Sequence, residues 1–373
     1  MSATSIAKYL IGASNIKYEV LDTIFKDVPI KNDIINLYID TDYVFHRLYR
    51  NNTNSDLYAV EGNVLVMDIV VTVINMIGHY RRYFATRLHK DNRIFLLFNT
   101  KIPAYQKHCY DSYGQTYYEK YKRNNKDYGE ITAVIQSAYK FIKSIIVYFE
   151  GLYCIDNSGI DNLTAIQHIR LNEVTKNDYS IIFTRNLLAC QLISDNCSVL
   201  YTKRDDSYMI TDKDPYEAIL AGKKTTSGEL TASMIPFCFG LSGYTERGIE
   251  SPACRGIVSG VKKVKKLMDD RKINPNSSNS SFIEAIENDF MSDELDDIKS
   301  LLNAITISLS EKALTSNQKE QIMSGIYDLY DQEGIDKINE MLMNLNSDGD
   351  IIDSVNLNMT VDNDSYYDGE WSM

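Results

Sequence analysis

IINLYID, residues 34–40, is a short and almost continuous apolar run that ends in a carboxylate. A run of this length and composition is typical of a strand buried on both faces, as in a parallel sheet. Comparable runs follow at 93–99, 152–156, 178–184 and 197–202. Segments with helical spacing separate these runs, the longest of them at 63–89. This alternation predicts an α/β fold in which helices flank a largely parallel central sheet.

Polar residues follow several of the predicted strands. In a parallel α/β sheet, ligands and catalytic groups gather outside the carboxyl ends of the strands. The residues expected to meet there are Asp40, Asn99, Asp156, Asp161 and Thr184 to Asn186. This edge of the sheet is therefore the expected place of a functional site.

The overall composition is that of a soluble globular protein. Of 373 residues, 44% are apolar and 24% are charged, and this length suggests two or three structural units. The apolar run at 64–77 is interrupted by polar side chains and is too short to span a bilayer, and MSATSIAKYL lacks the pattern of a secretory signal. The six cysteines are scattered and suggest neither a zinc site nor disulfides. We expect an intracellular protein without a membrane partner.

The net charge of −12 conceals a strong asymmetry. Residues 273–373 hold 21 acidic side chains and four lysines, a net charge of −17, so residues 1–272 carry +5. A mildly basic body with an acidic end suggests a nucleic-acid-binding unit joined to a segment that contacts proteins or masks the basic surface. Solubility is the alternative role of such an acidic end. Tyr366, Tyr367 and Trp371 lie among acids near the end and are candidates for partner binding.

Six stretches occur in a characteristic order. They are LYIDTD (37–42), IFLLFN (94–99), YYEKYKRNN (117–125), YCIDNSGIDNLTAI (153–166), SIIFTRNLLACQL (180–192) and FCFGLSGYTERGIESPACRGIVSGVKKVKKL (237–267). Their order and spacing resemble the 5′-nuclease family of the PIN-like superfamily, which comprises flap endonucleases and 5′→3′ exonucleases, and especially its phage RNase H-like branch. The resemblance implies a PIN-like sheet, a basic helical arch, and a helix–three-turn–helix that grips duplex DNA.

The same resemblance implies a cluster of carboxylates that holds divalent cations for phosphodiester cleavage. Asp40 matches the first of these acids, and Asp161 can stand for the Glu of the acidic cluster. The remaining matched positions hold Asn99, Leu163, Thr164, Asn186, Leu188 and Leu241. Because leucine cannot bind Mg²⁺ and asparagine brings no charge, we expect a nuclease fold that has lost its metals and its activity. Alternatively, Asp40, Asp42, Asp156 and Asp161 hold one Mg²⁺ or Mn²⁺ in a working nuclease.

Binding of nucleic acid does not require these acids, because phosphates are held by backbone N–H groups and by Lys or Arg. The candidates in the helix–three-turn–helix region are Gly256 and Gly260 in the turn and Lys262, Lys263, Lys265 and Lys266 on the following helix. In the arch-like segment, Lys120, Lys122 and Arg123 alternate with tyrosines and are expected to contact a single strand. A solvated helix face is the alternative interpretation of both basic runs.

These features divide the chain into five parts. They are a PIN-like α/β domain (1–235), a helix–three-turn–helix-like region (236–272), a linker (273–281), an acidic helical extension (282–345) and an acidic disordered tail (346–373). The leading hypothesis is an inactive 5′-nuclease-like protein that binds DNA or RNA as an architectural subunit of a viral or phage replication or transcription complex, in the host cytoplasm. The second alternative to it, after the active nuclease, is a protein–protein subunit that keeps the fold without binding DNA.

Overall fold

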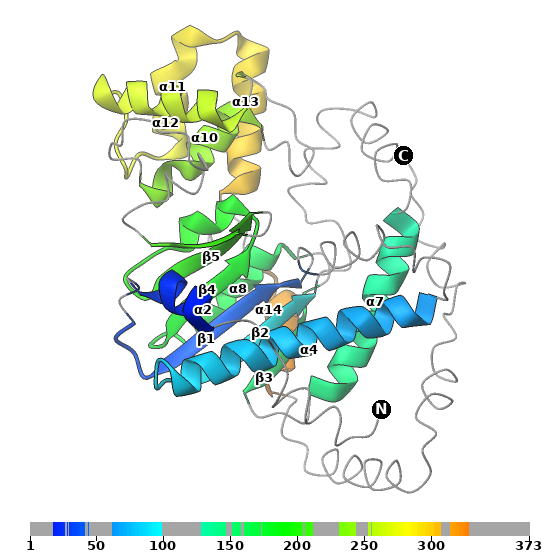
Figure 1. The fold of residues 1–373 in the computed structure, drawn as a ribbon. Coiled ribbons are helices and arrows are strands. Elements are labelled where there is room, and N and C mark those ends of the chain that lie inside the picture. The colour runs from blue at the N-terminus through cyan, green and yellow to red at the C-terminus, as the bar shows by residue number, and fades with distance from the viewer. Residues whose placement is uncertain are drawn as a thin grey trace, which may run out of the picture.

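The computed structural model describes residues 18–26, 28, 30–41, 44, 62–98, 128–146, 151–157, 160–172, 174–203, 206–211, 231–243, 253–254, 256–306 and 314–327. The strands in these ranges are β1 (Ile34–Asp40), β2 (Asp91–Phe98), β3 (Leu152–Asp156), β4 (Tyr179–Thr184), β5 (Cys197–Lys203) and β6 (Asp206–Ile210). They form one sheet in the order β3-β2-β1-β4-β5-β6, in which β1 to β5 are parallel and β6 is antiparallel (Figure 1). The predicted α/β fold with a largely parallel sheet is confirmed.

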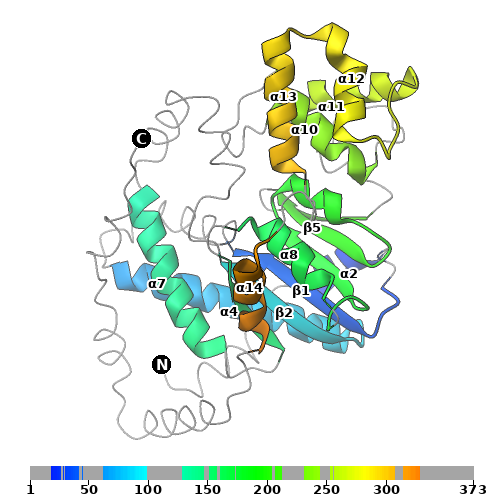
Figure 2. The ribbon, with the colours of Figure 1, turned by 180° about the vertical axis from the view of Figure 1, so that it is seen from behind.

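Helices cover both faces of this sheet. One face packs against α2 (Tyr18–Phe25), α4 (Gly62–Thr86) and α7 (Tyr128–Ile146), and its core includes Leu37, Leu96 and Phe183. The other face packs against α8 (Asn162–Arg170), the 3₁₀ helix η2 (Leu187–Leu192) and α14 (Ser316–Tyr327), and its core includes Tyr38 and Ile182 (Figure 2). Successive residues of a strand point to opposite faces, so nearly continuous apolar strands supply both cores.

A separate group of helices forms the top of the molecule in Figure 1. We call it the helical unit, and it comprises η3 (Ala232–Met234), α10 (Ile235–Ser242), α11 (Ile257–Asp269), α12 (Asn279–Ile286), η5 (Glu287–Asp289) and α13 (Ser292–Ile305). All eight residues of α10 are buried, because α11, α13 and η2 surround this helix. Helices α12 and α13, which lie within the predicted acidic extension apart from the first residues of α12, are part of this packed core.

The predicted linker 273–281 is an ordered connection within the helical unit. Asn274 and Ser277 close a turn through an Asn274 N–H bond to Ser277 Oγ of 2.9 Å, and Ser278 caps α12 by accepting a bond from the Ser281 N–H. The Asn- and Ser-rich composition thus supplies turn and capping side chains.

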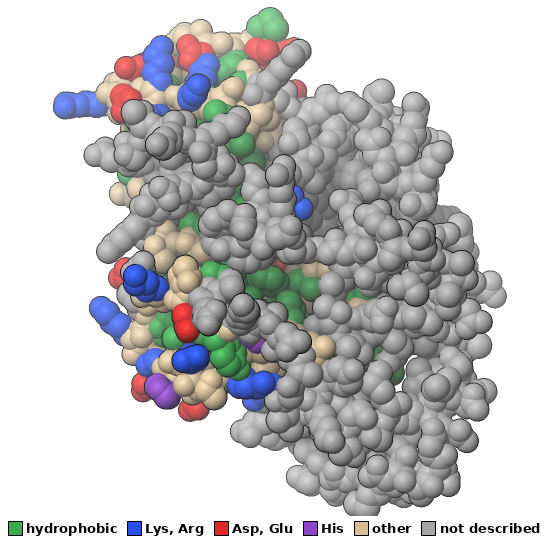
Figure 3. All heavy atoms as spheres, in the orientation of Figure 1, with side chains coloured by type: hydrophobic (Ala, Val, Ile, Leu, Met, Phe, Trp, Pro, Cys, Tyr) green, Lys and Arg blue, Asp and Glu red, His purple; other side chains and the backbone are tan. Residues whose placement is uncertain are grey.

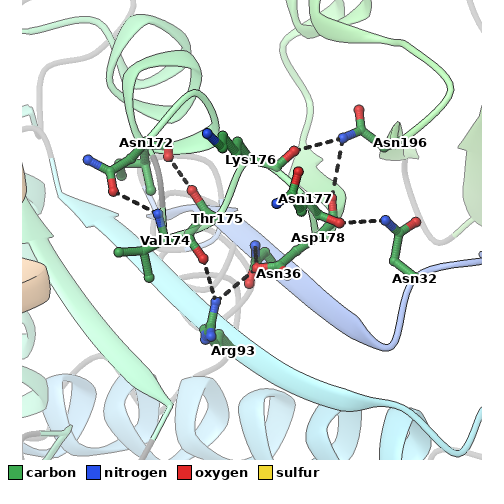
Figure 4. Close-up of polar contacts among 11 residues, drawn as sticks. Asn32, Asn36, Arg93, Asn172, Val174, Thr175, Lys176, Asn177, Asp178 and Asn196 are labelled. Carbon is green, nitrogen blue, oxygen red and sulfur yellow. Dashed lines mark hydrogen bonds and ion pairs between the residues drawn. The ribbon is translucent and has the colours of Figure 1, made fainter.

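The amino end of the sheet is braced by the loop between α8 and β4. Arg93 of β2 donates from Nη1 to Asp178 Oδ2 (2.8 Å) and to the carbonyl oxygen of Val174 (3.2 Å), and Asn36 of β1 also donates to Asp178 (Figure 4). In the same loop, Asn172 Oδ1 accepts a bond from the Val174 N–H. The helical spacing of NLTAIQHIRLNEV predicts a helix to residue 174, but this asparagine turn ends α8 at Arg170.

Helix α14 covers the free edge of the outermost strand, β3. Gly151 and Asn157 bond through their backbone to β2, so the alternate residues Cys154 and Asp156 direct their carbonyl groups away from the sheet. Gln321 Nε2 of α14 donates to the Asp156 carbonyl oxygen (2.9 Å), and a Cβ atom at Gly325 would lie 2.9 Å from the Cys154 carbonyl oxygen. An unpaired strand edge promotes association with other chains, and α14 blocks this edge.

No helix in the described part of the chain is long and apolar enough to cross a membrane.

Candidate functional site at the carboxyl edge of the sheet

Asp40 is the last residue of β1, and its side chain is buried at the carboxyl edge of the sheet with 1% exposed. Its Oδ1 accepts a bond from Asn162 Nδ2 at the start of α8, and its Oδ2 accepts a bond from Thr184 Oγ1 at the end of β4, both at 2.7 Å. Strands β1 and β4 are neighbours at the point where the strand order reverses. Open α/β sheets bind their ligands at this switch point. This edge is therefore the candidate functional site.

The donors to Asp40 are held by further polar groups. Asn157 Nδ2 donates to Asn162 Oδ1 (2.6 Å) and to the carbonyl oxygen of Ile160 (2.9 Å), which fixes the loop between β3 and α8. The Thr184 hydroxyl accepts a bond from the Asn186 N–H (3.0 Å) while it donates to Asp40. We call Asp40, Asn157, Asn162 and Thr184 the Asp40 network. The bonds that define this network come from amide and hydroxyl groups, which contribute neutral dipoles to the solvation of the buried Asp40 carboxylate.

Asp161 belongs to the frame of α8. It is the N-cap of this helix, and its Oδ1 accepts bonds from the N–H groups of Leu163 (2.9 Å) and Thr164 (3.3 Å). An Asp immediately before an apolar helical run is a common capping pattern, and this signal was present in the sequence. The next residue, Asn162, donates to Asp40. The family resemblance had matched the following positions, 163 and 164, to the acidic cluster.

The matched leucines are core residues. Leu163, Leu188 and Leu241 are at most 2% exposed and belong to the core on the α8 side of the sheet. Thr164 is buried beside them, and Asn186 caps η2 by accepting a bond from the Leu188 N–H (3.1 Å). At these positions the side chains stabilise packing and helix ends.

Asp156 lies on the other side of the sheet from the Asp40 network. It ends β3 next to Tyr139 of α7, whereas Asn162 approaches Asp40 from α8. Burial raises the pKa of Tyr139, and the Cys154 thiol and the Asp156 carboxylate add to this shift. Asp40 and Asp156 are thus assigned to different faces by the strand alternation.

The residues that the structure describes at this edge do not form a site for a pair of divalent cations. Two hard cations need several convergent carboxylates to offset their charge. Within the described ranges, no three Asp, Glu, His or Cys side chains are placed to share a metal ion. Asp40 binds Asn162 and Thr184, and Asp161 binds the backbone of α8. Two other candidates, Asp42 and Asn99, lie outside the described residues.

A second candidate surface is formed by α11. Lys262 and Lys266 are exposed on this helix, whereas Lys263 and Lys265 are half-buried. Lys263 pairs with Asp289, with Nζ 3.3 Å from Oδ2. In the space-filling view, basic and acidic side chains lie next to one another on the helical unit (Figure 3). Two of the four predicted lysines are therefore exposed and two are half-buried.

The two glycines of the predicted turn have different roles. Gly256 is exposed and is the N-cap of α11, with φ of 76°, a conformation that favours glycine. Gly260 lies inside α11 and is buried against α10, where a methyl group would collide with the carbonyl oxygen of Cys238. The prediction that Gly260 belongs to a phosphate-binding turn is therefore wrong, because the residue serves close helix packing.

The other predicted binding residues lie outside the described residues. They are Lys120, Lys122 and Arg123 of the arch-like segment and Tyr366, Tyr367 and Trp371 near the end of the chain.

Comparisons with known proteins give structural likenesses alone. No protein family matches the sequence. No curated protein matches it either. Among solved structures, the chain is similar to T5 5′-exonuclease with bound zinc, at 12% identity over 83% of this chain and 98% of that one, with a TM-score of 0.49. It is also similar to a bacteriophage T5 flap endonuclease in a pseudo-enzyme–product complex with DNA and metal ions (12% identity, 83% and 98%, TM-score 0.47) and to the catalytic core of Rad2 with a DNA substrate (10%, 80% and 93%, TM-score 0.35).

Proposed function

We propose that this protein binds nucleic acid through a 5′-nuclease-like fold without cleaving it, as an architectural subunit of a viral or phage replication or transcription complex. The observation that carries the proposal is the Asp40 network. At the edge where a metal-dependent nuclease needs several carboxylates, Asp40 is held by Asn162 and Thr184. Neutral donors satisfy a carboxylate without the positive charge that activates water or stabilises a leaving oxygen.

The basic face of α11 supports the binding half of the proposal. Lys262 and Lys266 are four residues apart, so they lie on the same side of the helix, and both are exposed. Lysines in this arrangement are suited to neighbouring phosphates of a nucleic-acid backbone. The acidic end of the chain would then recruit a protein partner or compete for this face.

Cleavage is tested with the purified full chain and a labelled 5′-flap DNA in Mg²⁺ and in Mn²⁺. We expect no product above that of the Asp40→Ala variant. Metal-dependent cleavage that Asp40→Ala abolishes would instead establish a working nuclease with an atypical carboxylate set. This variant is a matched control because it removes the carboxylate at the centre of the edge.

Binding is tested by fluorescence anisotropy with flap, duplex and single-stranded DNA or RNA at increasing salt. Phosphate contacts make the affinity fall as salt rises, with a slope of about 0.9 for each phosphate neutralised on a duplex. We expect the double variant Lys262→Gln, Lys266→Gln to weaken binding and flatten this slope. The control is the double variant Lys299→Gln, Lys319→Gln, which removes two exposed lysines from α13 and α14 and so changes the net charge by the same amount. Absence of binding by the unaltered protein at low salt would leave a protein–protein subunit as the remaining function.

A further inference from the structure

Lys263 of α11 makes contacts within the helical unit. Its Nζ lies 3.3 Å from Asp289 Oδ2 and 3.9 Å from the ring centroid of Phe290. Its charge also acts on Cys254, in the turn that enters α11, where it opposes the rise in pKa that burial causes. Asp289, Phe290 and Cys254 thus place the ammonium group between the start of α11 and residues 287–290, which we call the η5 segment.

The η5 segment brings negative charge to this position. Residues 273–298 contain seven acidic side chains and no Lys or Arg. In the second turn of α13, partial burial raises the pKa of Asp297, and the carboxylates of Asp293 and Asp296 raise it further. Like charges therefore repel one another along this part of the helical unit.

Lys263 would otherwise extend the exposed basic face. At 100° per residue, Lys266 lies about 40° and Lys263 about 100° around the helix from Lys262. All three ammonium groups fall within one side of α11. The carboxylate of Asp289 thus occupies the third position of a possible row of phosphates.

We propose that the η5 segment is a built-in competitor of the nucleic-acid backbone, in which Asp289 and Phe290 withhold Lys263 from phosphate until a ligand displaces them. This inference rests on the proposed function. The side chains of Lys263 and Asp289 are 30% and 43% exposed, and ion pairs at such exposure are weak. A phosphate can therefore displace the carboxylate, so the contact tunes affinity and does not close the surface.

The test compares full-length variants in duplex-binding titrations by fluorescence anisotropy. Asp289→Asn removes the carboxylate and keeps its shape, whereas Glu287→Gln removes an exposed charge two residues away and controls for the general effect of charge. We expect Asp289→Asn to bind the duplex about two- to fivefold more tightly than Glu287→Gln. Its affinity should also fall more steeply with salt, by a slope of up to about 0.9, because one more phosphate is contacted.

Two further variants separate the pair from other effects. In a Lys263→Gln background, Asp289→Asn should give no gain beyond that of Glu287→Gln, since the lysine that it releases is missing. Phe290→Leu keeps an apolar side chain but removes the ring, and it should raise the affinity in the same direction as Asp289→Asn. Circular dichroism melts of each variant verify that the helical unit is folded.

The outcomes distinguish this inference from the proposed function. If Asp289→Asn matches Glu287→Gln, or if its gain persists without Lys263, the competitor role is refuted although binding through Lys262 and Lys266 stands. If neither the unaltered protein nor any variant binds a duplex at low salt, the proposed function and the inference both fail.

Discussion

Single residues decide the chemistry of the carboxyl edge. Asp40 keeps a carboxylate where the fold gathers functional groups, and its partners Asn162 and Thr184 supply bonds without charge. A buried carboxylate without such donors would be strongly destabilising. The side chains around Asp40 therefore have a structural role, because they satisfy a buried carboxylate.

Replacement of Thr184 by Val measures this structural role. The variant removes the donor to Asp40 Oδ2 and the acceptor of the Asn186 N–H at nearly constant volume. We expect the free energy of unfolding to fall by about 1–3 kcal/mol, as measured by urea denaturation. Thr86→Val, at an exposed helical position, should change it by less than about 0.5 kcal/mol. An equal effect at both positions would show that the Asp40 network contributes nothing.

His79 gives the stability a dependence on pH. The residue is 2% exposed and stacks on Tyr18, with ring centroids 5.2 Å apart. Burial lowers its pKa below the ordinary 6.5, and Arg82 lowers it further. The unfolded chain therefore takes up a proton at a pH where folded His79 remains neutral, so stability present above pH 6.5 is lost as the pH falls through the folded pKa.

We expect the Tm of the protein to decrease between about pH 7.5 and pH 5.5, and the decrease to be smaller in His79→Phe, which keeps the stacked ring. The pKa of His168 is also lowered, by burial and by Lys319, so part of the decrease should remain in this variant. Differential scanning calorimetry at several pH values provides the measurement. Identical profiles for the two proteins would contradict the assignment to His79.

At the scale of elements, apolar patterning was sufficient for the sheet. Strands β1 and β3 have the predicted bounds, because their nearly continuous apolar residues fill the cores on both faces. Helical spacing continues to residue 174, so the sequence predicts a longer helix than α8. The helix ends at Arg170 because the side chain of Asn172 forms a turn with the Val174 N–H. The stretch NLLACQLIS (186–194) predicts an ordinary helix, whereas residues 187–192 form a 3₁₀ helix. Local hydrogen bonds of Asn side chains were the missing information.

The position of the candidate site follows from the sequence, but the side chains that meet there follow only in part. The edge follows from the strand order, and Asp40 follows from its place at the end of an apolar run. The bond from Asn162 to Asp40 joins residues 122 positions apart. It depends on the exact start of α8, and matching the motif one residue further along the sequence misses Asn162. The pairing of Lys263 with Asp289 likewise depends on tertiary packing of the helical unit.

Gly260 tests the close packing of α10 and α11. A methyl group at this position would collide with the backbone oxygen of Cys238, which cannot move without displacing α10. We expect Gly260→Ala to lower the free energy of unfolding by about 1–3 kcal/mol. The collision outweighs the stabilisation of about 1 kcal/mol that replacing glycine by alanine brings inside a helix without such a contact. Ser259→Ala, on the exposed side of the same helix, should be neutral or stabilising. A stabilised Gly260→Ala protein in urea denaturation would refute the close approach.

For the molecule as a whole, charge is distributed very unevenly. Residues 328–373 hold 12 acidic side chains and one lysine, so their removal changes the net charge from −12 to −1. Helix α14 ends at Tyr327 and is retained in such a protein. Negative charge in the chain repels a nucleic acid at distances up to the Debye length, which is about 10 Å at 0.1 M salt.

We expect the protein without residues 328–373 to associate with duplex DNA about tenfold faster at low salt, as measured by stopped-flow fluorescence. The difference should disappear near 1 M salt, where the Debye length is about 3 Å. A difference that persists at high salt would instead indicate a specific contact of the deleted residues. The high-salt arm is thus the internal control.

The attachment of α14 to the edge of the sheet links two distant parts of the sequence. Gln321 binds the backbone of Asp156 across 165 positions, and Ile322 and Ile326 are buried in the core of that face. We therefore expect α14 to stay bound to the sheet even when the chain between α13 and α14 is cut. A protease site introduced between Thr306 and Leu314 should yield two fragments that co-elute from a gel-filtration column and separate only in denaturant, so the protein would behave as a split molecule that reassembles from its pieces.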